Sequence, residues 1–158
     1  MWASASLIDP ESSAAVHCWI GTCGASVLIP KFVAKVPGAA PGSHRLAQVF
    51  ENVLANARGF APHGTSVEAS VTAEGPGDCC IVVADRGPGI PPAHLERVFD
   101  RFFSYRPGDP SSSRNHTGLG LSIARTIVRG LGGTITAANR PDGGSRFEIR
   151  IPIASRSS

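Results

Sequence analysis

Two asparagines in the stretch "ENVLANARG" could take part in phosphate chemistry. Asn52 and Asn56 lie four residues apart, which is one turn of a helix. A carboxamide oxygen can complete the set of oxygen ligands around a Mg²⁺ ion that phosphates already hold. The same spacing fits two surface amides at the edge of an apolar helical stripe, so the pair alone leaves both interpretations open.

A carboxylate and two glycines stand close together in "DRGPGI", residues 85–90. Asp85 directly follows "CCIVVA", a run that predicts a strand buried on both faces. Gly87 and Gly89 would let the backbone approach a ligand closely. A carboxylate at the floor of a pocket can accept a hydrogen bond from the exocyclic amino group of adenine. A plain Asp-Gly turn is the alternative interpretation.

Another pair of glycines, Gly118 and Gly120, opens the amphipathic run "TGLGLSIARTIV". The run is not a Walker phosphate loop, because no Gly-Lys-Ser/Thr follows. It is not a dinucleotide fingerprint either, since the third glycine is absent and no strand precedes it. The remaining interpretation is a helix N-terminus, whose free N–H groups and positive dipole end can hold phosphate.

The hydrophobic pattern predicts the elements that carry these residues. A helix is expected from His44, with Ser43 as its N-cap and Gly59 and Pro62 at its end. Strands are expected at 66–74 and 79–85, a short helix within 91–103, a helix after Gly118, and a hairpin at 134–139 and 146–153. This order predicts a two-layer α/β sandwich, with a mixed sheet and helices on one face. The helix after Gly118 should turn these apolar residues inward: Ile123, Ala124, Ile127, Val128 and Leu131.

Composition limits the class of protein. A chain of 158 residues with 42% hydrophobic and 17% charged residues suits one globular domain with a core. The formal charge of 15 − 12 = +3 is small and its basic residues form no cluster, so nucleic-acid binding is not expected. No apolar segment reaches the ~18 residues of a membrane span, and the first residues do not resemble a signal peptide. We therefore expect a cytoplasmic protein without a membrane span in this chain.

The N-terminal quarter and the cysteines carry little functional information. For residues 1–42 the sequence predicts only a poorly defined N-terminal extension, with one candidate strand near 27–36. The folded domain should occupy residues 43–154, and residues 155–158 should form a tail. Cys18 and Cys23 lack a second ligand pair at finger spacing, so a metal–thiolate site is not expected. Cys79 and Cys80 are adjacent in a predicted strand, where they would point to opposite faces and not bridge.

In combination and in this order, the motifs resemble the ATP-binding catalytic domain of sensor histidine kinases, within the gyrase, chaperone and mismatch-repair ATPase superfamily. The motifs are Asn-x-x-x-Asn-Ala, Asp-x-Gly-x-Gly-Ile, "VFDRFF" and Thr-Gly-Leu-Gly-Leu, and the resemblance runs from about His44 to Ile153. It implies a Bergerat-type fold with an ATP lid loop at 104–117. It also implies ATP and Mg²⁺ as the ligands.

The resemblance assigns a role to each motif. Asn56 corresponds to the magnesium-coordinating asparagine, with Asn52 one turn earlier, and Asp85 to the adenine-recognising aspartate. Arg101 is a candidate contact of the γ-phosphate, and Ser145 corresponds to a hydroxyl near the adenine aspartate. The other residues implied in nucleotide binding are Gly87, Gly89, Ile90, Phe99, Phe102, Thr117, Gly118, Leu119, Gly120 and Leu121, with Phe103 completing the phenylalanine box.

Some features depart from the family pattern. Gly59 stands where the family often has Lys or Arg, with Arg58 one step early, and His116 stands where a glycine is usual. None of the five histidines is followed by an acidic residue, and no helical hairpin is evident before His44. The phosphoacceptor hairpin is therefore expected in trans or in a longer parent chain, with a response regulator receiver domain as the next partner.

Two other functions fit the same motifs. Anti-sigma-type serine kinases share the fold, but their sequence pattern has Glu at the position of Asn52. The phenylalanine box also favours the sensor-kinase type. A binding module that uses nucleotide to gate a partner, without kinase activity, is the other alternative.

The expected lid should respond to nucleotide. Residues 104–117 are rich in Pro, Gly and Ser, with Tyr105 as the main apolar side chain, so burial would not offset an ordering entropy of ~1 to 2 kcal/mol per residue. Bound Mg-ATP should order this segment through contacts with its arginines. We predict that trypsin cleaves after Arg114 more slowly when saturating Mg-ATP is present. Equal cleavage rates with and without nucleotide would contradict a closing lid.

Overall fold

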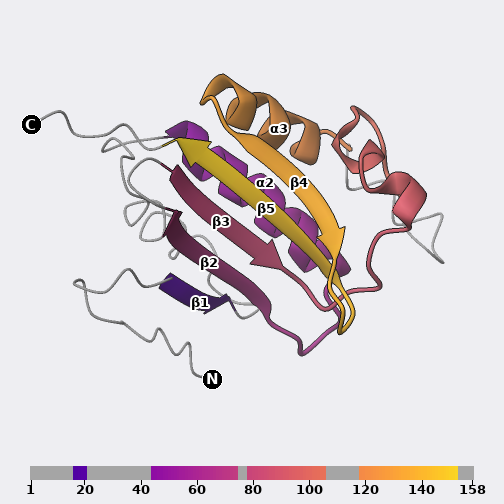
Figure 1. The fold of residues 1–158 in the computed structure, drawn as a ribbon. Coiled ribbons are helices and arrows are strands. Elements are labelled where there is room, and N and C mark those ends of the chain that lie inside the picture. Colours follow the sequence, from indigo (N-terminus) through magenta and orange to yellow (C-terminus); the bar gives the residue numbers. More distant parts are fainter. Residues whose placement is uncertain (1–15, 21–43, 75–77, 106–117, 153–158) are drawn as a thin grey trace, which may run out of the picture.

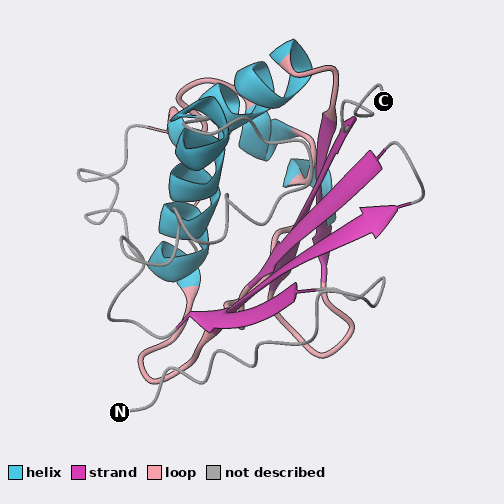
Figure 2. Ribbon diagram, turned by 90° about the vertical axis from the view of Figure 1, so that its left-hand side faces the viewer, coloured by secondary structure: helices cyan, strands magenta, loops and turns pink. Residues whose placement is uncertain are grey.

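The computed structural model describes residues 16–20, 44–74, 78–105 and 118–152. In this part of the chain two helices pack on one face of a five-stranded sheet (Figure 1). Figure 2 shows the helices on one side and the sheet on the other, so the predicted two-layer α/β sandwich is confirmed. The elements, in chain order, are β1 (Val16–Ile20), α2 (His44–Phe60), β2 (Val67–Glu74), β3 (Asp78–Ala84), the 3₁₀ turns η1 (Pro92–His94) and η2 (Arg97–Phe99), α3 (Gly120–Gly130), β4 (Thr134–Asn139) and β5 (Ser145–Pro152).

The sheet has the strand order β1-β2-β3-β5-β4 (Figure 1). All four pairings between the described strands are antiparallel, although a mixed sheet was expected. The reason is the position of β5. Strands β3 and β4 run in the same direction, but β5 turns back from β4 through a short hairpin and inserts between them. No parallel pair therefore forms at this part of the sheet.

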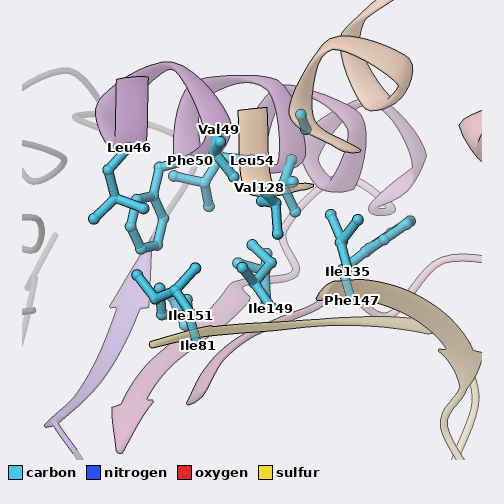
Figure 3. Close-up of a cluster of buried hydrophobic side chains, with 14 of the residues drawn as sticks. Leu46, Val49, Phe50, Leu54, Ile81, Val128, Ile135, Phe147, Ile149 and Ile151 are labelled. Carbon is cyan, nitrogen blue, oxygen red and sulfur yellow. The ribbon is translucent and has the colours of Figure 1, made fainter. Parts of the chain in front are cut away.

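The core lies between α2, α3 and the sheet (Figure 3). Helix α2 contributes apolar residues at helical spacing, and these are at most 3% exposed. Alternate residues of β3 and β5 face them, as the period of a strand requires. The buried residues labelled in the figure are Leu46, Val49, Phe50, Leu54, Ile81, Val128, Ile135, Phe147, Ile149 and Ile151.

The N-terminal part differs from the sequence expectation. Strand β1 pairs with β2 in antiparallel register, from Val16 opposite Val71 to Ile20 opposite Val67. The sheet therefore takes in residues that the pattern left without an element. The candidate strand near 27–36 lies outside the described residues. Strand β1 has only five residues and no clear period of its own. Its pairing with β2 defines it more than its own residues do, and this is why the sequence pattern did not predict it.

Two helical segments also differ from expectation. The stretch 91–103 forms the separate turns η1 and η2 instead of one short helix, with Pro91 and Pro92 at the start of the first. Ile123, which was expected to face inward, is 40% exposed on α3. Ala124 and Val128 are fully buried on the same helix, so the apolar face is narrower than its sequence suggested. Helix α2 continues through Gly59 to Phe60.

The adjacent cysteines of β3 are buried and free. Burial is the main cause that raises the pKa of the Cys79 thiol to about 11, and Cys80 and Glu74 add to it. Burial also raises the pKa of Cys80. In the described part of the chain no three His, Cys, Asp or Glu side chains gather into a metal-binding group. None of the helices described there has the length and apolar character to cross a membrane.

Candidate functional site

A cavity of about 240 Å³ opens beside the core, between α2, the loop after β3 and the first turn of α3. The three motifs singled out in the sequence meet here, although they are far apart along the chain. Its lining residues are Asn52, Ala55, Asn56, Phe60, Asp85, Gly89, Ile90, Val98, Phe103, Ser104, Tyr105, Gly118, Gly120, Leu121, Ser145 and Phe147.

Asp85 is the most deeply buried charged group of the cavity, at 1% exposed. Its Oδ1 accepts hydrogen bonds from Gly87 N at 2.7 Å and from Ser145 N at 3.3 Å. Its Oδ2 accepts a short hydrogen bond from Ser145 Oγ. A carboxylate that is removed from water needs such donors to offset its lost hydration. The three bonds fix the orientation of the carboxylate towards the cavity.

Two glycines make this arrangement possible because the chain passes very close to itself. A Cβ on Gly87 would lie 2.7 Å from Phe60 O and 2.9 Å from the Asp85 Oδ1 atom. Gly144, with φ +98°, packs directly against the Asp85 carbonyl. A Cβ at either position would lie closer to these atoms than a side chain permits. Glycine at 87 and 144 therefore lets α2, the loop after β3 and the β4–β5 turn meet around Asp85.

Helix α2 supplies the amides on the other side of the cavity. Asn52 and Asn56 both line it, one turn apart, beside the apolar face that enters the core. The Asn52 Nδ2 atom is buried and has no hydrogen-bond partner among the residues that the structure describes. An unpaired buried amide costs about 1 to 3 kcal/mol, so a ligand oxygen in the cavity would relieve it.

The first turn of α3 faces these amides. A Cβ on Gly120, the first residue of α3, would lie 3.7 Å from the Asn52 Cβ, so the two helices approach closely at the cavity. The N-cap residue Leu119 provides no side-chain hydrogen bond to the helix start. Among the described residues no hydrogen bond uses the N–H groups of this first turn, and the helix dipole favours an anion there.

The three phenylalanines of "VFDRFF" take different positions. Phe99 is buried, and its ring packs edge-on against Phe147 at 6.3 Å between centroids. Phe103 lines the cavity beneath Arg97, whose guanidinium lies 4.9 Å from the ring centroid. Phe102 is 75% exposed, with a left-handed φ of 64°. Its N–H donates to Gly118 O at 3.0 Å, which ties the loop after η2 to the start of α3.

Comparison with known proteins identifies this arrangement. Residues 42–155 match the family described as "Histidine kinase-, DNA gyrase B-, and HSP90-like ATPase". The chain belongs to this family. It is 42% identical over 120 residues to the probable sensor histidine kinase TcrY of Mycobacterium tuberculosis, and 40% over 122 residues to the hybrid signal transduction histidine kinase D of Dictyostelium discoideum. These matches cover 75% and 73% of this chain, but only 24% and 8% of the two relatives.

Solved structures share the fold, a sensor histidine kinase among them. The mycobacterial sensor histidine kinase MprB superposes with a TM-score of 0.64 at 31% identity, covering 71% of this chain and 74% of that one. Full-length ShkA in complex with AMPPNP gives a TM-score of 0.59 at 28% identity, covering 72% of this chain and 22% of that one. The chain is therefore an ATPase domain of the histidine-kinase type, matched to one part of longer proteins.

The structure brings most of the residues expected from the family pattern into this domain's cavity. The ones that line it are Asn52, Asn56, Asp85, Gly89, Ile90, Phe103, Gly118, Gly120, Leu121 and Ser145. Gly87, Phe99 and Leu119 are not among the lining residues, but Gly87 bonds to Asp85, Phe99 packs against Phe147, and Leu119 precedes the first turn of α3. Phe102 and Arg101 are exposed and are absent from the lining. Thr117 and most of the expected lid, residues 106–117, lie outside the described residues.

Several lining residues were not expected to contribute. Phe60 closes the end of α2 over the cavity, and Phe147 faces it from β5. Ser104 and Tyr105, the first two residues of the expected lid, also line it, and Tyr105 stacks on His94 at 4.8 Å between ring centroids. Phe147 lies in the strand predicted at 146–153, but its contact with the cavity depends on where the sheet ends. Local sequence patterns do not report that position.

Gly87 offers a direct test of this packing. We predict that Gly87→Ala lowers the free energy of unfolding by about 1 to 3 kcal/mol, because the added Cβ collides with the α2 backbone at Phe60 O. Gly130→Ala is the matched control, since a Cβ there meets nothing within 4 Å. The control should be neutral or stabilising by up to about 1 kcal/mol. Urea unfolding curves measure both, and equal losses would contradict the packing argument.

Proposed function

We propose that this chain is the ATP- and Mg²⁺-binding catalytic domain of a two-component sensor kinase. It transfers the γ-phosphoryl group of ATP to a histidine on a phosphoacceptor helical hairpin, supplied in trans or by a longer parent chain. A response regulator receiver domain then takes the phosphoryl group. The two curated relatives named above are both called histidine kinases, which supports the proposal. A cytoplasmic location follows from the need for ATP.

The buried carboxylate of Asp85 carries the proposal. An ionised carboxylate has about four acceptor positions. Three of those on Asp85 are used by Ser145 Oγ, Ser145 N and Gly87 N. No other described residue is seen to donate to Asp85, so one position remains, at the floor of a cavity lined by apolar side chains such as Phe147 and Ile90. An exocyclic amino group on a flat heterocycle fits both features, and adenine carries one.

The opposite end of the cavity suits a triphosphate. The α3 start can bind phosphate oxygens through its N–H groups, and the Asn52 amide needs an acceptor. Mg²⁺ would be held by the Asn56 carboxamide oxygen together with phosphate oxygens, and would neutralise charge on the transferred group. The solved relative ShkA was crystallised with the adenine nucleotide AMPPNP, which supports the same ligand class here.

Phosphoryl transfer requires mainly positioning and charge neutralisation from the protein. Asn52 and Asn56 are the proposed catalytic side chains on α2, because both face the cavity. Arg101 is proposed as a γ-phosphate contact. It lies two residues after the end of η2 and is exposed, so it is accessible to a phosphate that extends from the cavity. Its guanidinium would neutralise charge that develops during transfer.

The assignment of Asp85 can be tested by substitution. We predict that Asp85→Asn weakens ATP by ~1.5 to 3 kcal/mol, or roughly 10- to 150-fold in Kd, because the amino group loses its charged acceptor. Asp78→Asn is the control, since Asp78 lies exposed at the other end of β3. Isothermal titration with Mg-ATP measures both variants. Unchanged ATP affinity in Asp85→Asn would sink the adenine assignment.

The kinase assignment needs an acceptor in the assay. We predict that radiolabelled ATP gives no acid-labile label on this chain alone, because none of its five histidines has an acidic residue after it. Adding a purified dimeric phosphoacceptor hairpin from a sensor kinase should produce acid-labile label on the hairpin.

Other outcomes separate the alternatives. Tight Mg-ATP binding without label on hairpins from several sensor kinases would favour a nucleotide-gated binding module. Acid-stable label on a serine of a partner protein would favour an anti-sigma-type kinase. Acid-labile label on a histidine of this chain alone would contradict an acceptor in another domain.

A further inference from the structure

The loop after β3 is fastened at its far end by Asn139, the last residue of β4. Asn139 Oδ1 accepts a hydrogen bond from Ile90 N at 2.7 Å, and Asn139 Nδ2 donates one to Ile90 O at 2.7 Å. One side chain thus satisfies both main-chain groups of Ile90. The carboxamide makes the pair of bonds that a residue of a neighbouring antiparallel strand would make.

The position of Asn139 in the sheet explains why this bond pair matters. Asn139 lies opposite Ser145 in the β4–β5 register, and Asp85 N donates to Ser145 O at 3.0 Å. Asp85, Ser145 and Asn139 therefore form one row across the ends of β3, β5 and β4. The loop leaves this row at Asp85, crosses the end of β5, and returns to the row where Ile90 meets Asn139.

Gly89 is shaped to admit the Asn139 amide. It has a φ of +79°, and an added Cβ would lie 3.0 Å from Asn139 Oδ1. Gly89 and Ile90 both line the cavity, whereas Asn139 itself is not among the lining residues. We therefore do not expect Asn139 to contact a ligand in the cavity directly. It determines where two lining residues stand.

We propose that Asn139 is a positioning residue for recognition of the adenine base. By fixing Ile90 to the row that holds Asp85, it sets the width of the space in which the base lies between Asp85 and the Gly89–Ile90 backbone. This inference rests on the proposed binding of ATP. The sequence motifs did not include Asn139, which stands 49 residues from its partner Ile90.

A separate set of contacts holds the same hairpin and provides a control. Arg86 forms ion pairs with Glu68 and Asp142 at 3.2 Å each, and Arg140 pairs with the same two carboxylates at 3.1 and 3.0 Å. The hydrogen bond from Arg140 is the main cause that lowers the pKa of Asp142. None of these ion pairs involves Ile90. Asp142→Ala therefore loosens the hairpin turn without removing the Asn139 bonds.

The test compares Asn139→Ala and Asn139→Asp with Asp142→Ala at a temperature where all three are folded. Asn139→Asp keeps an acceptor for Ile90 N but sets a carboxylate oxygen against Ile90 O. We expect both Asn139 variants to raise the Kd for ADP about tenfold and to lower the preference for ADP over GDP. Hydrogen exchange of the Ile90 amide should accelerate in both. Asp142→Ala should change the ADP affinity by less than about twofold.

The outcomes are distinguishable from those of the proposed function. If the parent chain does not bind ADP, the proposed function fails, whatever the exchange of Ile90 shows. If the parent binds ADP and Asn139→Ala binds it equally well, with the same preference over GDP, the positioning role is refuted. An equal loss in Asp142→Ala would also refute it, because the effect would then come from the hairpin as a whole.

Discussion

The buried carboxylate of Asp85 is the interaction on which the rest of the site depends. At 1% exposure it needs hydrogen-bond donors, and Ser145 supplies two of its three. Those donors are available only because β5 lies directly beside β3. The insertion of β5 between β3 and β4 therefore sets the sheet order and the floor of the cavity together. Gly144 belongs to the same constraint, since its backbone packs directly against the Asp85 carbonyl.

Helix α2 couples the core to the cavity through its own period. One face places residues such as Val49 and Val53 in the core at 0% exposure, and the adjacent stripe turns Asn52 and Asn56 to the cavity. The amides cannot shift along the helix axis unless the apolar face slides over the sheet. A close-packed core resists such movement. Apolar contacts that take no part in the chemistry of the site therefore largely determine its rigidity.

Much of the fold and of the site could be predicted from the sequence, because the patterns that indicate them involve residues close together in the chain. The period of α2, the buried run of β3 and the glycines at 87 and 118 each need only their near neighbours to be recognised. Strand β1 and the Asn139–Ile90 bonds could not be found in that way. Both depend on which distant segment lies alongside, and pairing between segments far apart leaves no local pattern. The exposure of Ile123 has the same origin, because the apolar residues of α3 outnumber those that its neighbours can cover.

The cavity is built from segments that are each fastened at both ends. The loop after β3 is held at Asp85 by Ser145 and at Ile90 by Asn139. The chain on either side of residues 106–117 is joined by the bond from Phe102 N to Gly118 O at 3.0 Å. Gly118, with φ +65°, permits that contact, because a Cβ would lie 2.8 Å from the Phe102 carbonyl carbon. Phe102 and Gly118 are therefore neighbouring points of a fixed frame beside the first turn of α3, where the proposed phosphate site lies.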